Sequence, residues 1–236
     1  MIMIFYFVGC TSEELTSARL YIQQKNWEKA EEYLLKAMEV EPENPEVFYS
    51  LGKYTYAKKK DWRKMNKMFD KALEIDSNRV ILQGKTVKVY VEQVRYKHWR
   101  KEYNKGVSNF QNYQNKKEKS DDNYLNKSIT HFETSIQIYP DKIENYLNLS
   151  TCYFENGDSE KSVRTIKEGA DLSPENFDVN LAAGQILNKN NDVIYSLNIY
   201  DELQKYVINN ADQTPAMAII KGTGHNDGEF FFYSKS

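Results

Sequence analysis

Small residues recur along this chain at a fixed spacing inside stripes of apolar residues. A small residue is followed seven positions later by another, and a proline usually stands five positions beyond that. The clearest instances are Ala30, Ala37 and Pro42, then Ser128, Ser135 and Pro140, then Ser162, Gly169 and Pro174. Weaker instances are Met65, Ala72 and Ser77, then Ser196, Leu203 and Ile208. This period predicts stacked helix pairs, with small residues where the two helices of a pair cross.

The stretches around these small residues carry apolar side chains at helical spacing. The first stripe comprises Leu15, Ala18, Tyr21 and Ile22, and the second comprises Ala30, Tyr33, Leu34, Ala37 and Val40. Pro42 ends the second helix, because proline cannot continue a helix. The same scheme restarts at Pro45, but Ala37 and Ala72 are 35 residues apart rather than 34. We therefore expect the turn of this second unit to be one residue longer.

Two sets of residues make the repeat comparable with a known family. One is Phe48, Leu51 and Gly52, and the other is Leu149, Ser150, Tyr153, Asn156-Gly157-Asp158, Ser162, Ile166, Gly169 and Pro174. In type and spacing they resemble the tetratricopeptide repeat. The resemblance is clearest over 11–44, 45–78 and 143–176, and continues more weakly over 177–210 through Ala183, Gly184, Leu187, Ser196 and Tyr200. It implies an all-α fold, a right-handed α-solenoid of about five helix pairs.

The third unit, residues 79–142, departs from the regular pattern. Val80, Gly84, Val87, Val91 and Val94 fall on one helical face, so we expect one long helix over 79–114 with a possible break at Gly84. Such a helix either braces the stack or meets a partner, and the polar insertion NKKEKSDDN follows it. From residue 211 the pattern is lost, and we expect a short capping helix over 216–220 and a flexible tail.

The N-terminal run MIMIFYFVG stops at Cys10 and resembles the end of a bacterial lipoprotein signal peptide, with Val8 and Gly9 before the cysteine. The run is too short to span a bilayer as a helix. The resemblance implies that residues 1–9 are removed, that Cys10 is acylated and that the protein is anchored to a bacterial envelope membrane. The alternative is a cytoplasmic protein whose apolar N-terminus caps the solenoid.

Charge is segregated along the chain although the net charge is only -2. Residues 45–117 carry 18 Lys and Arg against 7 Asp and Glu, a net of +11, and the rest of the chain carries -13. Either the surface neutralises itself, or a basic surface meets anionic lipid or an acidic partner. We expect no nucleic-acid binding.

The sequence offers no catalytic constellation. His98, His131 and His225 are dispersed, and the two cysteines, Cys10 and Cys152, lack metal-ligand or disulfide-scaffold spacing. We therefore expect a non-catalytic protein with no cofactor, no metal and no small-molecule substrate. Cys152 lies in an apolar run and is expected to be buried.

Binding is what the family resemblance implies. In tetratricopeptide repeats the first helix of each pair lines a concave groove, so this chain is expected to be an interaction scaffold for a peptide or partner helix. The groove positions transferred by spacing are Arg19, Gln23, Tyr49, Lys53, Tyr56, Tyr103, Val107, Phe110, Leu147, Thr151, Phe154 and Gln185.

Overall fold

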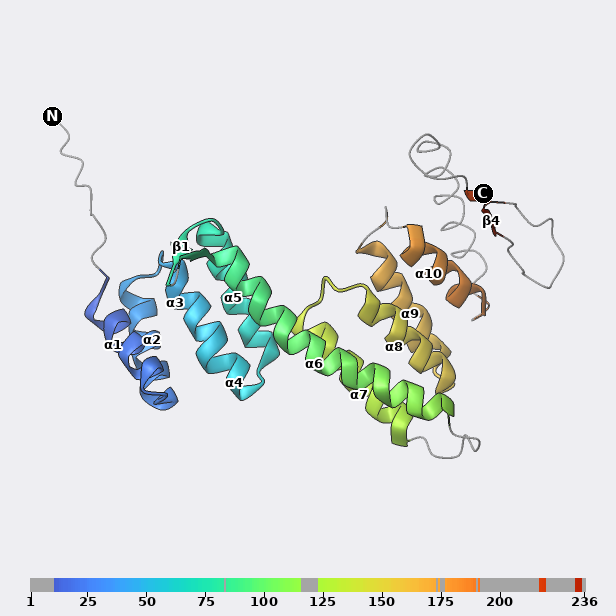
Figure 1. Cartoon of the computed structure of the whole chain (residues 1–236), viewed down its shortest axis with the longest axis horizontal. Helices are drawn as coiled ribbons and strands as arrows, with labels where there is room; N and C mark the ends of the chain where they lie inside the picture. The colour runs from blue at the N-terminus through green and yellow to red at the C-terminus, as the bar shows by residue number, and fades with distance from the viewer. Residues whose placement is uncertain are drawn as a thin grey trace. The chain divides into compact units, whose positions relative to one another are not determined.

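The computed structural model describes residues 11–82, 84–115, 123–172, 174, 177–189, 191, 217–219 and 232–234 (Figure 1). These residues are mainly helical, as the periodicity predicts, so the all-α expectation is confirmed. The chain divides into two compact units, Met1–Trp99 and Arg100–Ser236. Each unit is described separately below.

The first unit contains two helix pairs, a small hairpin and the start of a long helix. Its elements are α1 (Glu13–Gln23), α2 (Trp27–Val40), α3 (Pro45–Ser50), the π-helical segment η1 (Leu51–Tyr56), α4 (Ala57–Lys59), α5 (Trp62–Asp76), β1 (Val80–Ile81), β2 (Lys85–Thr86) and α6 (Val87–Asn115). The helix α3, η1 and α4 follow one another without interruption. They therefore make up the first helix of the second pair, and α5 is its second helix.

Small residues lie where the helices of each pair cross. Ala37 and Ala72 have no exposed surface. A methyl group added at Gly52 would collide with the Phe69 ring, which shows how closely the η1 backbone approaches α5. The predicted role of small residues at the crossings is therefore correct in this unit.

The turns between paired helices are the same in three pairs. The residue before each N-cap has a positive φ: Lys25 and Lys60 at 58° and Gly157 at 78°. The N-cap N–H then donates to a tyrosine carbonyl five residues earlier, from Asn26 to Tyr21, Asp61 to Tyr56 and Asp158 to Tyr153. This hydrogen-bond pattern is that of a Schellman-type helix end.

The repeat spacing predicts that the extra residue of the second unit lengthens its turn. That prediction is wrong, because the turn has the same length in all three pairs. The extra residue lies in η1: Gly52 and Tyr56 are four positions apart, whereas Ala18 and Tyr21 are three apart. Inserting one residue into a helix widens a turn from i→i−4 to i→i−5 hydrogen bonding. The turn and the helix crossing are both preserved, because the helix absorbs the insertion.

The expected helix over 79–114 begins only at Val87. Before it, β1 and β2 pair antiparallel as a hairpin, with Val80 opposite Thr86. Leu82 and Gly84 have φ values of 48° and 84°, in the left-handed region that an α-helix excludes. The Val89 N–H donates to the Thr86 hydroxyl at 3.4 Å at the helix start. The expectation of a helical 79–86 is therefore wrong.

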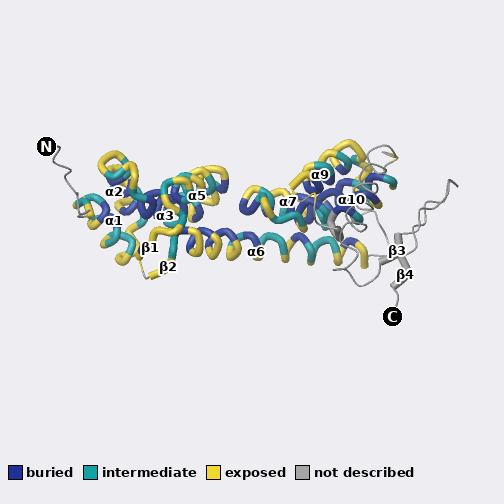
Figure 2. The backbone as a smooth tube through the Cα atoms, turned by 90° about the horizontal axis from the view of Figure 1, so that it is seen from above, coloured by how far each residue is buried: buried dark blue, intermediate teal, exposed yellow. Residues whose placement is uncertain are grey.

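Beyond the hairpin, the valine stripe is buried as predicted. Val87, Val91 and Val94 are buried, whereas Val80 is exposed. Buried Arg95 joins α6 to α5, because its guanidinium donates to Asn66 Oδ1 at 2.9 Å and to Asp70 Oδ1 at 2.7 Å. Figure 2 shows the alternation of buried and exposed positions along α6.

The second unit contains the end of α6 followed by α7 (Asn123–Ile138), α8 (Glu144–Glu155), α9 (Ser159–Asp171) and α10 (Phe177–Lys189). Its main core cluster comprises Tyr113, Leu125, Ile129, Phe132, Leu149, Cys152 and Tyr153. A methyl group added at Gly106 would meet Phe132 at 2.8 Å, and one at Gly169 would meet Tyr146 Cβ at 2.6 Å. Close helix crossing through small residues thus recurs here.

Three buried serines at these crossings form hydrogen bonds through their hydroxyls. Ser128 Oγ donates to the Gly106 carbonyl at 2.8 Å. Ser150 and Ser162 each donate to the other's carbonyl, at 2.8 and 2.9 Å. These three serines keep the volume small and pair their polar atoms with the facing helix. Ser135, the second small residue of α7, is equally buried, but its hydroxyl has no hydrogen-bond partner among the described residues.

Near the C-terminus, β3 (Met217–Ile219) pairs antiparallel with β4 (Phe232–Ser234). The expected capping helix over 216–220 is therefore wrong for residues 217–219, which form a strand. Cys10, the KKEKSDD part of the insertion, Ser196, Tyr200, Leu203 and Ile208 lie outside the described residues. Within the described ranges, no helix is both long enough and apolar enough to cross a bilayer.

Candidate partner-binding surface

The predicted groove residues of the first unit differ in how much surface they offer. Gln23 is exposed on α1, whereas Tyr56 is half-buried in η1 and packs against the core cluster that contains Leu34 and Leu51. Arg19 is committed to its own chain, because its Nε and a terminal nitrogen both donate to the buried Glu46 carboxylate at 2.7 Å. That hydrogen bonding raises the pKa of Arg19. Arg19 therefore joins α1 to α3.

Tyr49 has no exposed surface and belongs to the core. Its ring centroid lies 6.0 Å from that of Phe69 and 5.4 Å from that of Tyr90. Tyr49 stands three residues before Gly52, the position that Leu15 occupies relative to Ala18. Leu15 is equally buried, so this repeat position faces the core in both pairs.

Lys53 is the feature of this unit that points to a ligand. Its ammonium nitrogen lies 4.7 Å from the Tyr54 ring centroid, 5.4 Å from that of Tyr49 and 6.0 Å from that of Tyr90. Burial, the largest influence, lowers the Lys53 pKa, but interactions with the Tyr49 and Tyr54 hydroxyls outweigh it and leave that pKa raised. Within the part of the chain that the structure describes, Lys53 makes no ion pair with a carboxylate.

In the second unit the predicted aromatic strip is half-buried. Tyr103, Val107 and Phe110 follow one face of α6 and pack against the cluster around Phe132. The Tyr103 ring meets Phe132 edge-on at 5.7 Å, and its hydroxyl accepts a hydrogen bond from Asn148 Nδ2 at 3.1 Å. These side chains are partly core, and each leaves a strip of surface.

The remaining predicted residues lie on α8 and α10. Leu147 packs against the cluster of Ile166 and Leu187, and the Thr151 hydroxyl donates to the Leu147 carbonyl at 2.9 Å. Phe154 is half-buried and Gln185 is exposed. Thr151 stands one residue after Ser150, the position that Lys53 occupies relative to Gly52, and brings no charge there.

Sequence reasoning missed the aromatic surroundings of Lys53, since Tyr54 and Tyr90 were not among the predicted groove residues. Tyr54 comes from η1, which contains the inserted residue, and Tyr90 comes from α6, 37 residues after Lys53 in the sequence. The extra residue in the repeat was a visible signal for Tyr54. Nothing in the sequence pairs Tyr90 with Lys53.

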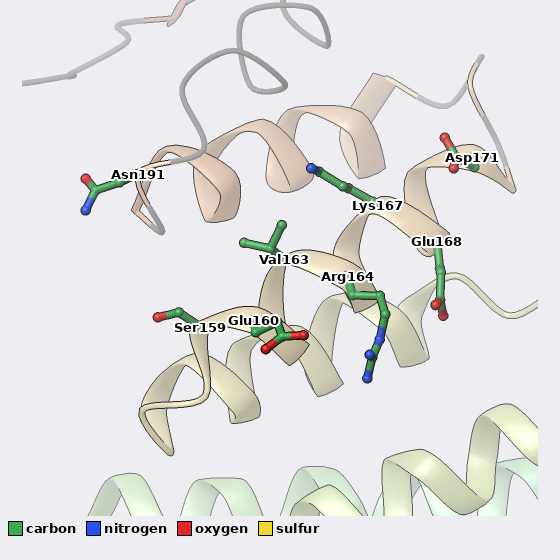
Figure 3. A pocket seen from close by; sticks show the side chains of 8 residues that line it. All are labelled: Ser159, Glu160, Val163, Arg164, Lys167, Glu168, Asp171 and Asn191. Atoms are coloured by element: carbon green, nitrogen blue, oxygen red, sulfur yellow. The ribbon is translucent and has the colours of Figure 1, made fainter.

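A second surface feature lies on the outer face of α9. An open depression of about 660 Å³ is lined by Ser159, Glu160, Val163, Arg164, Lys167, Glu168, Asp171 and Asn191. Figure 3 shows these side chains along α9, with Asn191 contributed from just beyond α10. Its lining mixes two basic with three acidic residues and has one apolar residue, so it shows no preference for one ligand class.

The Cys152 thiol and the His131 imidazole both have structural roles within the fold. Burial raises the pKa of the Cys152 thiol to about 11, and Ser128 Oγ lies 3.4 Å from its sulfur. Cys152 is thus a buried thiol, as predicted. His131 Nδ1 lies 2.8 Å from Glu102 Oε2 on the neighbouring helix. Among the described residues, no group of three or more His, Cys, Asp or Glu is placed to hold a metal ion.

Two segments of the chain, 15–44 and 143–176, match the family model of the tetratricopeptide repeat. The chain contains tetratricopeptide repeats. The matched segments correspond to the pairs α1–α2 and α8–α9. The pair over 45–76, which contains η1, has the same turn and crossing but is not among the matched segments.

Solved structures with similarity to this tetratricopeptide repeat protein include a crystal structure of MamA, with 13% identity, a TM-score of 0.41 and coverage of 88% of this chain and 97% of that one. Pseudomonas aeruginosa PilF is 16% identical, with a TM-score of 0.36 and coverage of 82% and 74%. YrrB, described as having an unusual peptide-binding site, is 13% identical, with a TM-score of 0.34 and coverage of 84% and 86%. These values say nothing about what the present chain binds. No curated protein matches the chain.

Proposed function

We propose that this tetratricopeptide repeat protein is a non-catalytic scaffold that binds an extended peptide or a partner helix carrying an acidic group. The observation that carries the proposal is Lys53, a half-buried ammonium beside three tyrosine rings with no carboxylate partner in the described residues. A partly desolvated charge interacts more strongly with an incoming carboxylate than a fully solvated one does. The tyrosine rings hold the ammonium in place through cation–π contacts.

Apolar anchors complete the proposed surface of each unit. Tyr56 in the first unit and Tyr103, Val107, Phe110, Leu147 and Phe154 in the second are half-buried, so each presents a strip of apolar surface while its position is fixed by packing. Gln23, Thr151 and Gln185 supply hydrogen-bonding groups. A peptide that uses apolar anchors and one acidic residue fits this chemistry.

Random-peptide display on the full chain with Cys10→Ser tests the proposal. We expect selected peptides to share an acidic residue near apolar residues, and Lys53→Met to raise their Kd at least about tenfold. The matched control is Lys25→Met, an exposed lysine on the turn after α1. Selection of peptides without acidic residues, or equal affinity for both variants, contradicts the proposal.

We further propose that an acylated Cys10 anchors the protein to a bacterial envelope membrane. Support comes from the lipoprotein-like run before Cys10 alone, since that run lies outside the described residues. Fractionation of cells fed labelled fatty acid should place the wild type, labelled, in the membrane and Cys10→Ser, unlabelled, outside it. A soluble, unlabelled wild type supports the alternative, a cytoplasmic adaptor.

A further inference from the structure

The hairpin between α5 and α6 exposes an unusual concentration of apolar side chains. Eight large apolar residues are exposed in the described part of the chain, and three of them fall within ten residues. Val80 is 62% exposed, Leu82 42% and Val89 41%. Figure 2 shows the hairpin as an exposed loop beside the start of α6.

Basic residues surround these apolar side chains. Arg79, Lys85 and Lys88 lie in the stretch from Ser77 to Val91, which contains no Asp or Glu. The backbone brings them together, because the Val87 N–H donates to the Arg79 carbonyl and the Lys88 N–H to the Ser77 carbonyl, both at 3.0 Å. We call Arg79, Val80, Leu82, Lys85, Lys88 and Val89 the hairpin surface.

The base of the hairpin is fixed to the fold while its outer side chains remain exposed. Ile81 and Val87 are buried. The Lys85 ammonium contacts Gln93 Oε1 at 3.4 Å and lies 5.9 Å from the Tyr90 ring centroid, so its stem packs along α6. Val80 and Leu82 are therefore exposed although the base of the hairpin is packed against the fold.

We propose that the hairpin surface docks on an anionic lipid bilayer. Apolar side chains at the rim of a protein partition into the interfacial region of a bilayer, and lysine and arginine beside them bind anionic headgroups. Asp76 and Glu92 flank the surface, so three basic residues stand against two acidic ones. Exposed apolar groups with an excess of positive charge match that environment. The contact is peripheral and does not depend on acylation of Cys10, so it stands if the anchoring proposed above fails.

Environment-sensitive fluorescence locates the contact in the full chain with Cys10→Ser. A nitrobenzoxadiazole probe is attached at Leu82→Cys or, as a control, at Leu20→Cys, which is 51% exposed on α1. Cys152 is buried and escapes labelling. With phosphatidylglycerol vesicles we expect a blue shift and intensity gain at position 82 only, and no change with phosphatidylcholine vesicles.

A charge series measures the electrostatic part of the same contact. Arg79→Gln with Lys88→Gln should lower the partition coefficient onto phosphatidylglycerol vesicles about 30-fold, because each basic residue near an anionic surface contributes roughly a fivefold gain. The control pair, Arg63→Gln with Lys67→Gln on the exposed face of α5, should change it far less.

Three outcomes overturn the proposal. The probe at position 82 stays unchanged with anionic vesicles, which leaves an acidic protein as the partner of this surface. Both probes change equally, which means that another segment carries the membrane contact. Both charge pairs lower partitioning equally, which means that the contact reflects overall charge alone.

Discussion

The pair α3–α5, with η1 inside its first helix, and the pair α8–α9 solve the same packing problem with different chain lengths. Both cross through a glycine, Gly52 or Gly169, and both turn through a positive-φ residue into an aspartate N-cap. They differ by one residue between the small residue and the tyrosine that closes the turn. The comparison shows that turn and crossing are the fixed parts of the repeat, and that the helix between them can change.

Burial identifies which residue is extra. Thr55 and Cys152 are both buried and stand immediately before Tyr56 and Tyr153, and Lys53 and Thr151 follow the small residues. Tyr54 is left without a counterpart. The π segment therefore adds one half-buried tyrosine next to Lys53 without displacing either neighbour from its repeat position.

The largest effects should come from arginine at the two crossings. Ala72→Arg and Gly169→Arg each place a long charged side chain at a buried small position, and each should destabilise its pair by about 4 kcal/mol or more. Urea unfolding followed by circular dichroism measures this. Glu74→Arg, exposed on α5, serves as control and should stay within about 0.5 kcal/mol. If either arginine variant kept the stability of the wild type, the two pairs would not cross in the same way.

A smaller difference should separate the two glycines themselves. The methyl group of Gly169→Ala meets Tyr146 Cβ, which is tied to its backbone, whereas that of Gly52→Ala meets the Phe69 ring, which can tilt. We expect Gly169→Ala to cost about 2–3 kcal/mol and Gly52→Ala about 1 kcal/mol less. The reverse order in urea unfolding would mean that the α3–α5 crossing is the more rigid.

The N-caps should behave alike. Asp61 accepts from the Lys64 N–H and Asp158 from the Lys161 N–H, both at 3.1 Å. Asp61→Ala and Asp158→Ala should therefore produce small and equal decreases in Tm, with the Asn variants, which retain a capping oxygen, close to wild type. Clearly unequal decreases would show that the two turns are not the same structure.

The smallest effect should come from deleting Tyr54. Removal of this residue turns η1 into regular helix and leaves turn and crossing in register, so stability should change by only about 1 kcal/mol. Deleting Thr151 from α8 is the matched control and should cost much more, because no extra residue exists there. A large loss on deleting Tyr54 would show that the π segment is required for folding.

The sequence was sufficient for features with a local periodic cause. The small residues at the crossings, the buried valines of α6 and the burial of Cys152 followed from spacing and hydrophobicity. The hairpin at 80–86 was missed because its valine and glycine also fit a helical face, and the left-handed φ of Leu82 has no sequence signal. The assignment of Tyr49 to the groove is wrong. Tyr49 and Leu15 share one repeat position, and the side chain at that position is buried in the core in both pairs.

The site was less predictable than the fold, because it depends on contacts distant in sequence. Register made Lys53 a candidate groove residue, but the Tyr90 ring beside it comes from a helix that the repeat pattern does not describe. The Arg19–Glu46 pair shows the opposite case, since a nominal groove cation is neutralised within the chain. Spacing identifies candidate positions, and only the structure shows which of them remain available to a partner.

The buried thiol of Cys152 has a practical consequence for measuring motion. In a Cys10→Ser background it is the only thiol in the chain. It packs with Phe132 and Leu149 and has no exposed surface, so a thiol reagent reaches it only when α8 separates from its neighbours. The labelling rate then reports how often this part of the repeat opens, and comparing that rate with and without a bound peptide would show whether binding suppresses the opening.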